Sequence, residues 1–211
     1  MINFFSQYFF TKLLTNVDFN VIIYIRDTYK GGNSLGKIVI LIGASGSGKS
    51  TIGNKLEFKY GITPLVSYTS RKKRDGEIDG IDYYFLSKET AKNYSLISVE
   101  QTVYDGNIYG LTSEEVDFKR ANSEDVYFIS DKHGASEMKK FYKDDVVVFW
   151  LKVSPYTMFK RMLKRGDTFK NACKRVIHAY KKGEFNPPEE AYILNANKHV
   201  DISEIYGILN K

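Results

Sequence analysis

The sequence predicts an α/β fold in which a parallel β-sheet carries helices on both faces. Two observations support this class. Short apolar stretches alternate with longer stretches of helical pattern through most of the chain, an order typical of parallel sheets. A glycine-rich stretch also separates the first apolar stretch from the first helical one, which is the arrangement of a phosphate-binding loop. We therefore expect ligands to bind at the carboxyl ends of the strands.

The expected elements follow one another in order along the chain. Strands are expected near residues 37–42, 64–67, 125–129, 146–151 and 192–195. Helices are expected near residues 49–58, 134–142, 154–165, 170–183 and 202–209. Pro64 lacks an amide proton, so it can stand only at the beginning of its strand. Between about residues 67 and 112, a more β-rich insert interrupts the alternation.

The composition fits a globular protein with one core and an anionic partner. The 211 residues include 43% hydrophobic side chains, and the formal net charge is +6. No apolar run reaches the roughly 18 residues of a membrane span. The single cysteine, Cys173, excludes an internal disulfide and favours a reducing compartment, so we expect a cytoplasmic protein. The three histidines, His133, His178 and His199, do not have the spacing of metal ligands.

Residues 1–36 form an N-terminal extension of different character. They are rich in aromatic and aliphatic side chains, and residues 21–25 could form a strand. They lack the basic start and small-residue cleavage site of a signal peptide. We expect an appendage that packs on the core or is poorly ordered. Alternatively, natural synthesis starts near Leu35, which native peptides from upstream of Leu35 would exclude.

The phosphate-binding loop is the stretch Gly43-Ala44-Ser45-Gly46-Ser47-Gly48-Lys49-Ser50-Thr51, which satisfies the motif G-x-x-x-x-G-K-[ST]. Its glycines let backbone N–H groups surround a polyphosphate, and the following helix adds unpaired N–H groups and the positive end of its dipole. Lys49 is expected to reach the β- and γ-phosphates of ATP, and Ser50 to ligate Mg²⁺. These features predict a sheet of the P-loop NTPase type.

The stretch after the second expected strand carries a more specific signal. From Ser67 to Phe85 the chain closely resembles the signature of the guanylate kinase family, S-x-T-T-R-x-P-R-x-G-E-x-x-G-x-D-Y-x-F. Ser70 and Lys73 stand where the signature has a threonine and a proline. The matching residues are Ser67, Thr69, Arg71, Arg74, Gly76, Glu77, Gly80, Asp82, Tyr83 and Phe85.

The resemblance continues to the end of the chain and covers about residues 37–211. Glu100 stands seven residues before Asn107 of a G-N-x-Y-G segment, and Asp131 stands three residues before a glycine. Residues 160–166 resemble the K-R-L-x-x-R-G segment that enters the family's lid, with Arg175 on the next helix. Asn195 matches an asparagine that lies near adenine in the family.

The resemblance implies transfer of the ATP γ-phosphoryl group to GMP with Mg²⁺, giving GDP and ADP. It implies a core of residues 37–66 and 113–211, an acceptor-binding insert of about 67–112 and a lid of about 166–170 that closes over the substrates. By the same likeness, Glu100 would accept hydrogen bonds from guanine, while Asp131 would order Mg²⁺ waters or bind a guanine edge. The acceptor phosphate would be held by Arg71, Arg74, Tyr83 and Tyr109, and Ser67 would be a further substrate-binding residue.

The residue types agree with this chemistry, because two polyanions must meet and a phosphate acceptor needs no strong base. Arginine forks and tyrosine hydroxyls suit phosphate binding. Arg161 and Arg165 lie four residues apart, on one face of an expected helix. With Arg175 and Lys49, they are the candidate catalytic residues for the transferring phosphoryl group.

Two departures from the family pattern leave the base open. Leu111 stands where the family has a hydroxyl that bonds the base, with Thr112 one residue later, and Ile129 replaces the first aspartate of a D-x-D pair. Another nucleoside or deoxynucleoside monophosphate therefore remains an alternative acceptor. A second alternative is an interaction module without catalysis. A nucleic-acid partner, which only the net charge and the basic residues 71–74 suggest, is not expected.

Overall fold

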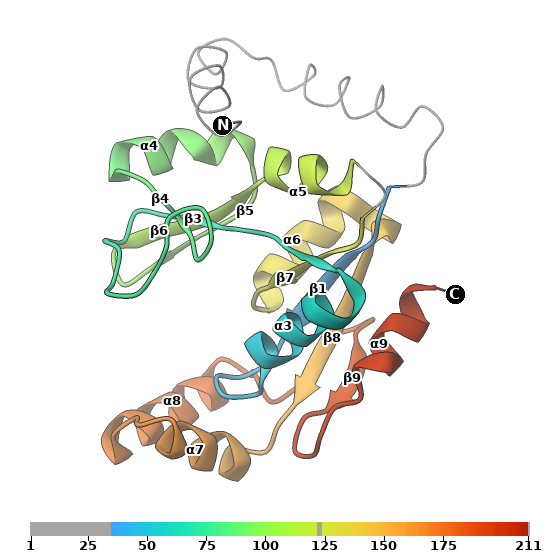
Figure 1. Cartoon of the computed structure of the whole chain (residues 1–211). Coiled ribbons are helices and arrows are strands. Elements are labelled where there is room, and N and C mark those ends of the chain that lie inside the picture. The colour runs from blue at the N-terminus through green and yellow to red at the C-terminus, as the bar shows by residue number, and fades with distance from the viewer. Residues whose placement is uncertain (1–34, 122–123, 211) are drawn as a thin grey trace. The chain divides into compact units, whose positions relative to one another are not determined.

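The computed structural model describes residues 35–121 and 124–210. Residues 1–34 of the predicted N-terminal extension, with the expected strand at residues 21–25, lie outside the described residues. Residues Gly36–Lys211 form one compact unit, which contains all the elements discussed below. Element labels follow Figure 1.

The main sheet is parallel throughout and has the strand order β2-β7-β1-β8-β9 (Figure 1). The central strand β1 is buried along its whole length, because an uninterrupted Ile-Val-Ile-Leu-Ile run can face helices on both sides. The strands are β1 (Ile38–Ile42), β2 (Thr63–Pro64), β7 (Val126–Ile129), β8 (Val146–Lys152) and β9 (Tyr192–Asn195).

One face of this sheet is covered by α3 (Lys49–Tyr60) and α9 (Ile202–Leu209). Val39 and Leu41 point to this face and belong to the same buried cluster as the apolar side chains of both helices. The alternation of side chains along a strand sends their neighbours to the opposite face.

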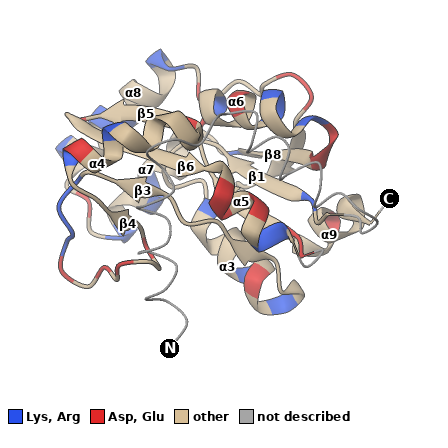
Figure 2. Ribbon diagram, turned by 90° about the horizontal axis from the view of Figure 1, so that it is seen from above, with Lys and Arg blue, Asp and Glu red and all other residues tan. Residues whose placement is uncertain are grey.

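The opposite face is covered by α5 (Ser113–Arg120) and α6 (Lys132–Tyr142). Ile38, Ile40 and Ile42 pack there with apolar side chains of the two helices. Figure 2 shows α6 and α3 on opposite sides of β1 and β8. The predicted α/β class, with a parallel sheet and helices on both faces, is therefore confirmed.

Two further helices pack on each other beyond the carboxyl end of β8 (Figure 1). They are α7 (Pro155–Lys164) and α8 (Phe169–Lys181), and their apolar faces meet in a third cluster that includes Met158, Met162 and Ala172. The predicted lid of about residues 166–170 covers most of the connection between them and the first two residues of α8, and its closing role remains a prediction.

The residues between β2 and α5 form a second sheet of strand order β4-β3-β6-β5. Gly110 in β6 lies against the ring of Tyr68, since an added Cβ would be 2.4 Å from the Tyr68 hydroxyl oxygen. That hydroxyl bonds Ser98 Oγ and accepts from Gln101 Nε2, each at 2.7 Å, and so ties β3 to β5 across β6. The elements are β3 (Tyr68–Thr69), β4 (Tyr84–Phe85), α4 (Lys88–Asn93), η1 (Tyr94–Ile97), β5 (Ser98–Tyr104) and β6 (Asn107–Thr112).

The structure corrects the predicted strand at residues 64–67. β2 ends at Pro64, and the amide of Val66 donates to Glu115 Oε1 at 2.8 Å instead of to the sheet. The chain therefore leaves the sheet one residue after the proline. The short helices α4 and α5 and the turn η2 (Lys143–Asp145) were not predicted, whereas the other predicted elements differ from the observed ones only near their ends.

Candidate active site

The phosphate-binding loop lies between β1 and α3, as its sequence predicts. Gly43, Gly46 and Gly48 have φ angles of 145°, 75° and 101°, which side chains rarely allow. Gly48 is the N-cap residue of α3 and has no side chain to cap the helix. The first N–H groups of α3 therefore have no capping side chain to accept their hydrogen bonds. The other described α-helices each begin with a capping side chain, from Ser87, Thr112, Asp131, Ser154, Thr168 or Asp201. The uncapped terminus is suited to an anion.

Lys49 lies at the centre of this loop. Its Nζ donates to Gly43 O at 2.6 Å and to Ala44 O at 3.3 Å. Burial lowers the pKa of Lys49, and the carboxylate of Glu184 acts in the opposite direction. An ammonium in such a partly water-excluded position interacts more strongly with a phosphate than it would in bulk water.

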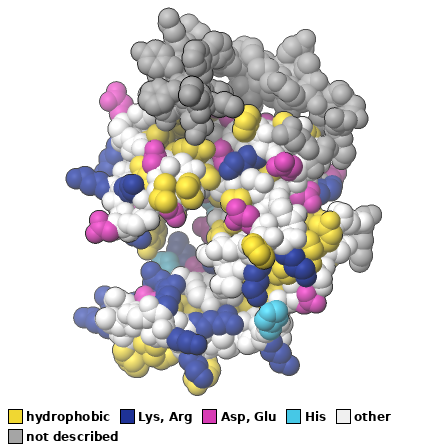
Figure 3. Space-filling model, viewed as in Figure 1, with side chains coloured by type: hydrophobic (Ala, Val, Ile, Leu, Met, Phe, Trp, Pro, Cys, Tyr) yellow, Lys and Arg dark blue, Asp and Glu magenta, His cyan; other side chains and the backbone are white. Residues whose placement is uncertain are grey.

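A first cavity of about 570 Å³ lies between the loop and the second sheet. The hollow is visible on the left of Figure 3, with Lys and Arg side chains gathered along its lower wall. Three loop residues, Gly43, Ser45 and Lys49, form part of its wall. Every predicted acceptor residue also lines this cavity: Ser67, Arg71, Arg74, Tyr83, Glu100, Tyr109 and Asp131.

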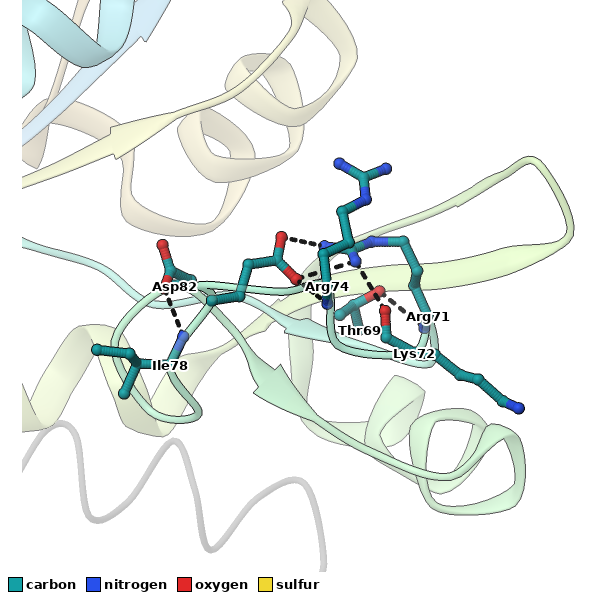
Figure 4. Close-up of polar contacts among 7 residues, drawn as sticks. Thr69, Arg71, Lys72, Arg74, Ile78 and Asp82 are labelled. Atoms are coloured by element: carbon teal, nitrogen blue, oxygen red, sulfur yellow. Dashed lines mark hydrogen bonds and ion pairs between the residues drawn. The ribbon is translucent and has the colours of Figure 1, made fainter.

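Arg71 is held in a fixed orientation at this cavity by Glu77. The guanidinium makes a bidentate pair with the carboxylate, at 2.7 and 3.0 Å, and lies 5.6 Å from the ring centroid of Tyr83. Glu77 also accepts from the backbone N–H of Arg74 at 2.8 Å. Figure 4 shows that the Arg74 side chain points away from this pair. Arg74 therefore offers its guanidinium to a ligand directly.

Tyr83 and Tyr109 stand next to each other on the wall of the same cavity, with ring centroids 6.0 Å apart. Burial raises the pKa of Tyr83, and the neighbouring Tyr109 adds to the effect. The Tyr83 hydroxyl consequently stays protonated near neutral pH and can donate a hydrogen bond.

Glu100 also lines this cavity and is only 8% exposed. Burial, with a contribution from the charge of Asp131, raises the pKa of Glu100 to about 7. Its carboxylate makes no hydrogen bond with the described residues. Asp131 caps α6 by accepting from the Gly134 N–H at 2.9 Å. An added Cβ at Gly134 would lie 2.1 Å from Ser130 Oγ and 3.0 Å from Glu100 Cγ, so a larger residue at this position would displace these side chains.

The two departures from the family pattern have different positions. Leu111 is fully buried and packs in the core, so this residue offers nothing to a ligand. Thr112 does not replace a base-directed hydroxyl, because it lines neither cavity described here; its side chain caps α5 by accepting from the Glu115 N–H at 3.3 Å. Ile129, by contrast, lines the cavity beside Asp131.

A second cavity of about 590 Å³ lies on the other side of the loop and shares Ser45 and Lys49 with the first. Gly46, Ser47, Gly48, Ser50 and Thr51 line it, together with Arg161 and Arg165. Arg161 does not project freely into this cavity. Its guanidinium donates to the carbonyls of Gly46 and Ser47, at 3.2 Å each, and of Ala196, at 2.7 Å. Arg161 thus holds the loop against the segment that follows β9.

The remaining predicted residues are Arg165, Arg175 and Asn195, and they differ in their contacts near this second cavity. Arg165 pairs with Asp167 at 2.5 Å in the predicted lid, and its side chain is half exposed. Arg175 donates to Ser45 Oγ at 3.5 Å, so α8 reaches the loop. Asn195 does not line the cavity, and its Oδ1 accepts from Asn197. Its predicted place near adenine stays a prediction.

Sequence reasoning missed several residues that line the cavities. Ser130 follows the carboxyl end of β7, a position where a polar residue signals a ligand site in parallel sheets. Lys198 and His199 line the second cavity a few residues after β9, and no motif marks them. Within residues 35–121 and 124–210, no group of three or more His, Cys, Asp and Glu side chains could hold a metal ion.

The site and the fold together define a P-loop protein with two cavities that meet over one phosphate loop. Comparisons with known proteins identify the family. The family model for guanylate kinase matches residues 35–208, and this chain belongs to the guanylate kinase family. In the part of the chain that the structure describes, no helix has the length and apolar character needed to cross a membrane.

Individual relatives extend over most of the chain. A guanylate kinase of Clostridium perfringens strain SM101 is 32% identical over 84% of this chain and 84% of its own length. One of Clostridium tetani is 30% identical over 83% of this chain and 86% of its own length. The crystal structure of guanylate kinase from Anaplasma phagocytophilum superimposes with a TM-score of 0.58 at 25% identity, covering 84% of this chain and 86% of the other.

Proposed function

We propose that this chain transfers the γ-phosphoryl group of ATP to GMP, giving ADP and GDP. The single observation that carries the proposal is that Ser45 and Lys49 line both cavities. Two nucleotides bound in these cavities would bring their phosphates together over the loop. An oxygen of the GMP phosphate then attacks the γ-phosphorus, and the bond from that phosphorus to the β–γ bridging oxygen breaks, releasing ADP.

The first cavity is the proposed GMP site. Arg74 and Arg71 neutralise the acceptor phosphate, with Glu77 keeping Arg71 in place. The hydroxyls of Tyr83 and Tyr109 donate to the same phosphate, and Ser67 adds a further hydroxyl to this wall.

Glu100 is the proposed acceptor for guanine N1–H and the exocyclic amine. Its carboxylate has no other hydrogen bond among the described residues, and burial makes each new one stronger than it would be in water. Adenine offers no such pair of donors, so the same carboxylate disfavours it. Asp131 stands close enough to influence Glu100 electrostatically and is proposed to contact the guanine edge or ordered water.

The second cavity is the proposed ATP site. The loop residues from Ser45 to Thr51 line this cavity and would surround the phosphates, with Lys49 at the β- and γ-phosphates. Ser50 would hold Mg²⁺, and its exposed hydroxyl in the first turn of α3 makes no hydrogen bond with the described residues. One hydroxyl suits an ion that keeps several waters and binds chiefly through substrate phosphates. When bound, Mg²⁺ neutralises charge on the β- and γ-phosphates.

Arg165 and Arg175 are the proposed catalytic arginines. Arg165 follows the last residue of α7 and Arg175 lies in α8, and they would reach the transferring group once Arg165 releases Asp167. Arg161 has a different role here, since its contacts to loop carbonyls make it a residue that positions the loop. Closure of the lid would exclude water and so suppress ATP hydrolysis. The cytoplasmic location expected from the sequence is part of this proposal.

The test is ADP release from Mg·ATP with GMP, dGMP, AMP, UMP, CMP and IMP in parallel, with Lys49→Ala as control. The proposal expects activity with GMP that the control lacks. Activity only with another monophosphate would keep the chemistry and overturn the base assignment. ATP binding without transfer to any acceptor would favour an interaction module.

A further inference from the structure

We propose that Ser130 donates a hydrogen bond to the 6-oxo group of guanine and is a second specificity-determining residue beside Glu100. This inference rests on the proposed function and deepens it, because it assigns the base contact that Leu111 cannot make.

Ser130 is next to Glu100 in space although thirty positions separate them in the chain. An added Cβ on Gly134 would lie 2.1 Å from Ser130 Oγ and 3.0 Å from Glu100 Cγ, so both side chains converge on one point. Both residues line the first cavity. The backbone N–H of Ser130 donates to Leu41 O at 3.2 Å, which fixes the residue at the carboxyl end of the sheet.

The hydroxyl of Ser130 is free to bind a ligand. It makes no hydrogen bond with residues 35–121 or 124–210, although it is partly buried in the wall of the cavity. A partly buried hydroxyl without a protein partner is satisfied by water or by a ligand. Ser130 therefore has an unused donor at the place where Glu100 has an unused acceptor.

Guanine presents three adjacent groups on one edge: the exocyclic amine, N1–H and the 6-oxo oxygen. A carboxylate can accept from the first two but repels the third, which is itself an acceptor. The 6-oxo oxygen therefore needs a donor beside the carboxylate, and a buried acceptor left without one weakens binding. Ser130 and Glu100 together match the whole edge.

The other hydroxyls of this region are less suited to the 6-oxo group. Thr112 caps α5. Thr102 pairs across the strands with Tyr109, at the phosphate end of the cavity, whereas Glu100 pairs with Leu111. Ser67 precedes β3, on the far side of β6 from Glu100. The ammonium of nearby Lys132 donates to Gly183 O at 2.6 Å.

The test compares three acceptors with the full-length protein and Mg·ATP. GMP has both the 6-oxo group and the amine, IMP has only the 6-oxo group, and 2-aminopurine riboside 5′-monophosphate has only the amine. For Ser130→Ala we expect kcat/KM to fall about ten- to a hundredfold with GMP and with IMP. With the 2-aminopurine nucleotide we expect a change of less than about twofold, because no 6-oxo group is present to lose its donor.

Ser67→Ala is the matched control, because it removes the same atom from another wall of the same cavity. Ser67→Ala is expected to change kcat/KM by the same factor for all three acceptors. Ser130→Cys keeps a side chain of similar size with a weak donor. Its kcat/KM with GMP and with IMP should therefore lie between the values of the wild type and of Ser130→Ala. Equal thermal unfolding midpoints would exclude a folding defect as the cause of the losses.

Three results would overturn the inference. Ser130→Ala could leave kcat/KM for GMP unchanged. It could lower kcat/KM equally for all three acceptors. Alternatively, Ser67→Ala could lower kcat/KM for GMP and IMP but not for the 2-aminopurine nucleotide. Each of these leaves the GMP kinase activity of the wild type intact and so overturns this inference alone. A wild-type chain that neither binds nor phosphorylates GMP would overturn the proposed function and this inference with it.

Discussion

Glu100 predicts a pH dependence of GMP binding that can be worked out from its burial. The pKa of this carboxyl is raised to about 7, and the proposed contacts to guanine require the ionised form. A group with that pKa is about one-tenth ionised at pH 6 and about nine-tenths ionised at pH 8. The KM for GMP is therefore expected to be about tenfold higher at pH 6 than at pH 8.

The assay is ADP release at saturating Mg·ATP across pH 6 to 8. The GMP phosphate also titrates near pH 6, so the profile must be compared with that of Glu100→Gln, which has no titrating group at this position. The ratio of the two KM values isolates the carboxyl. Parallel profiles for wild type and Glu100→Gln would refute the reasoning.

Protein stability gives a second readout that needs no nucleotide. Because the pKa of Glu100 in the folded state lies above its ordinary value of 4.5, the folded state binds the proton more tightly than the unfolded state. This contribution to stability is fully present below about pH 4.5 and is lost as the pH rises through 7. Over that window the wild type should lose up to about 3 kcal/mol of unfolding free energy more than Glu100→Gln, measured by chemical denaturation.

Three further predictions concern the other walls of the site and the second sheet. Arg165→Ala should lower kcat by about 10³-fold or more while changing ATP affinity little, in steady-state and equilibrium-binding measurements, because the proposed contact forms only during transfer. Glu77→Gln should raise the KM for GMP about tenfold, because Arg71 loses its bidentate partner. Gly110→Ala should lower the unfolding free energy by about 2–4 kcal/mol in chemical denaturation, because the new Cβ would displace the buried Tyr68.

A different result would contradict each of these three predictions. Equal losses of kcat and ATP affinity in Arg165→Ala would argue against a transition-state role. An unchanged KM in Glu77→Gln would show that Arg71 does not depend on the pair. Gly207→Ala is the control for Gly110→Ala, because a Cβ at Gly207 meets nothing within 4 Å and should not destabilise α9. Similar effects of the two glycine substitutions would contradict the packing argument.

The main sheet could be predicted from the sequence because its strands are continuous apolar runs followed by helical patterns. The second sheet was harder to predict. Its strands β3 and β4 have two residues each, too few for an alternating pattern to emerge. The end of β2 depends on the contact between Val66 and Glu115, residues from different elements, so no local signal announces it.

The candidate site was predictable where a motif fixes the spacing, as in the phosphate loop and in the acceptor segment from Ser67 to Phe85. What the sequence could not provide is how each side chain is used. The four-residue spacing of Arg161 and Arg165 predicted the same role for both. In the structure, however, Arg161 donates to loop carbonyls, whereas Arg165 pairs with Asp167 in the lid segment. Ser130 escaped notice because its relation to Glu100 exists only in the packing around Gly134.

The most direct test of the account follows the phosphoryl group itself. ATP labelled with ³²P at the γ-phosphate would be incubated with the full-length protein, Mg²⁺ and unlabelled GMP, and the products separated. We expect label in the β-phosphate of GDP, with little in inorganic phosphate, and none in GDP when Lys49→Ala replaces the wild type. Label that appears in inorganic phosphate, or remains in ATP while GMP is present, would contradict this expectation.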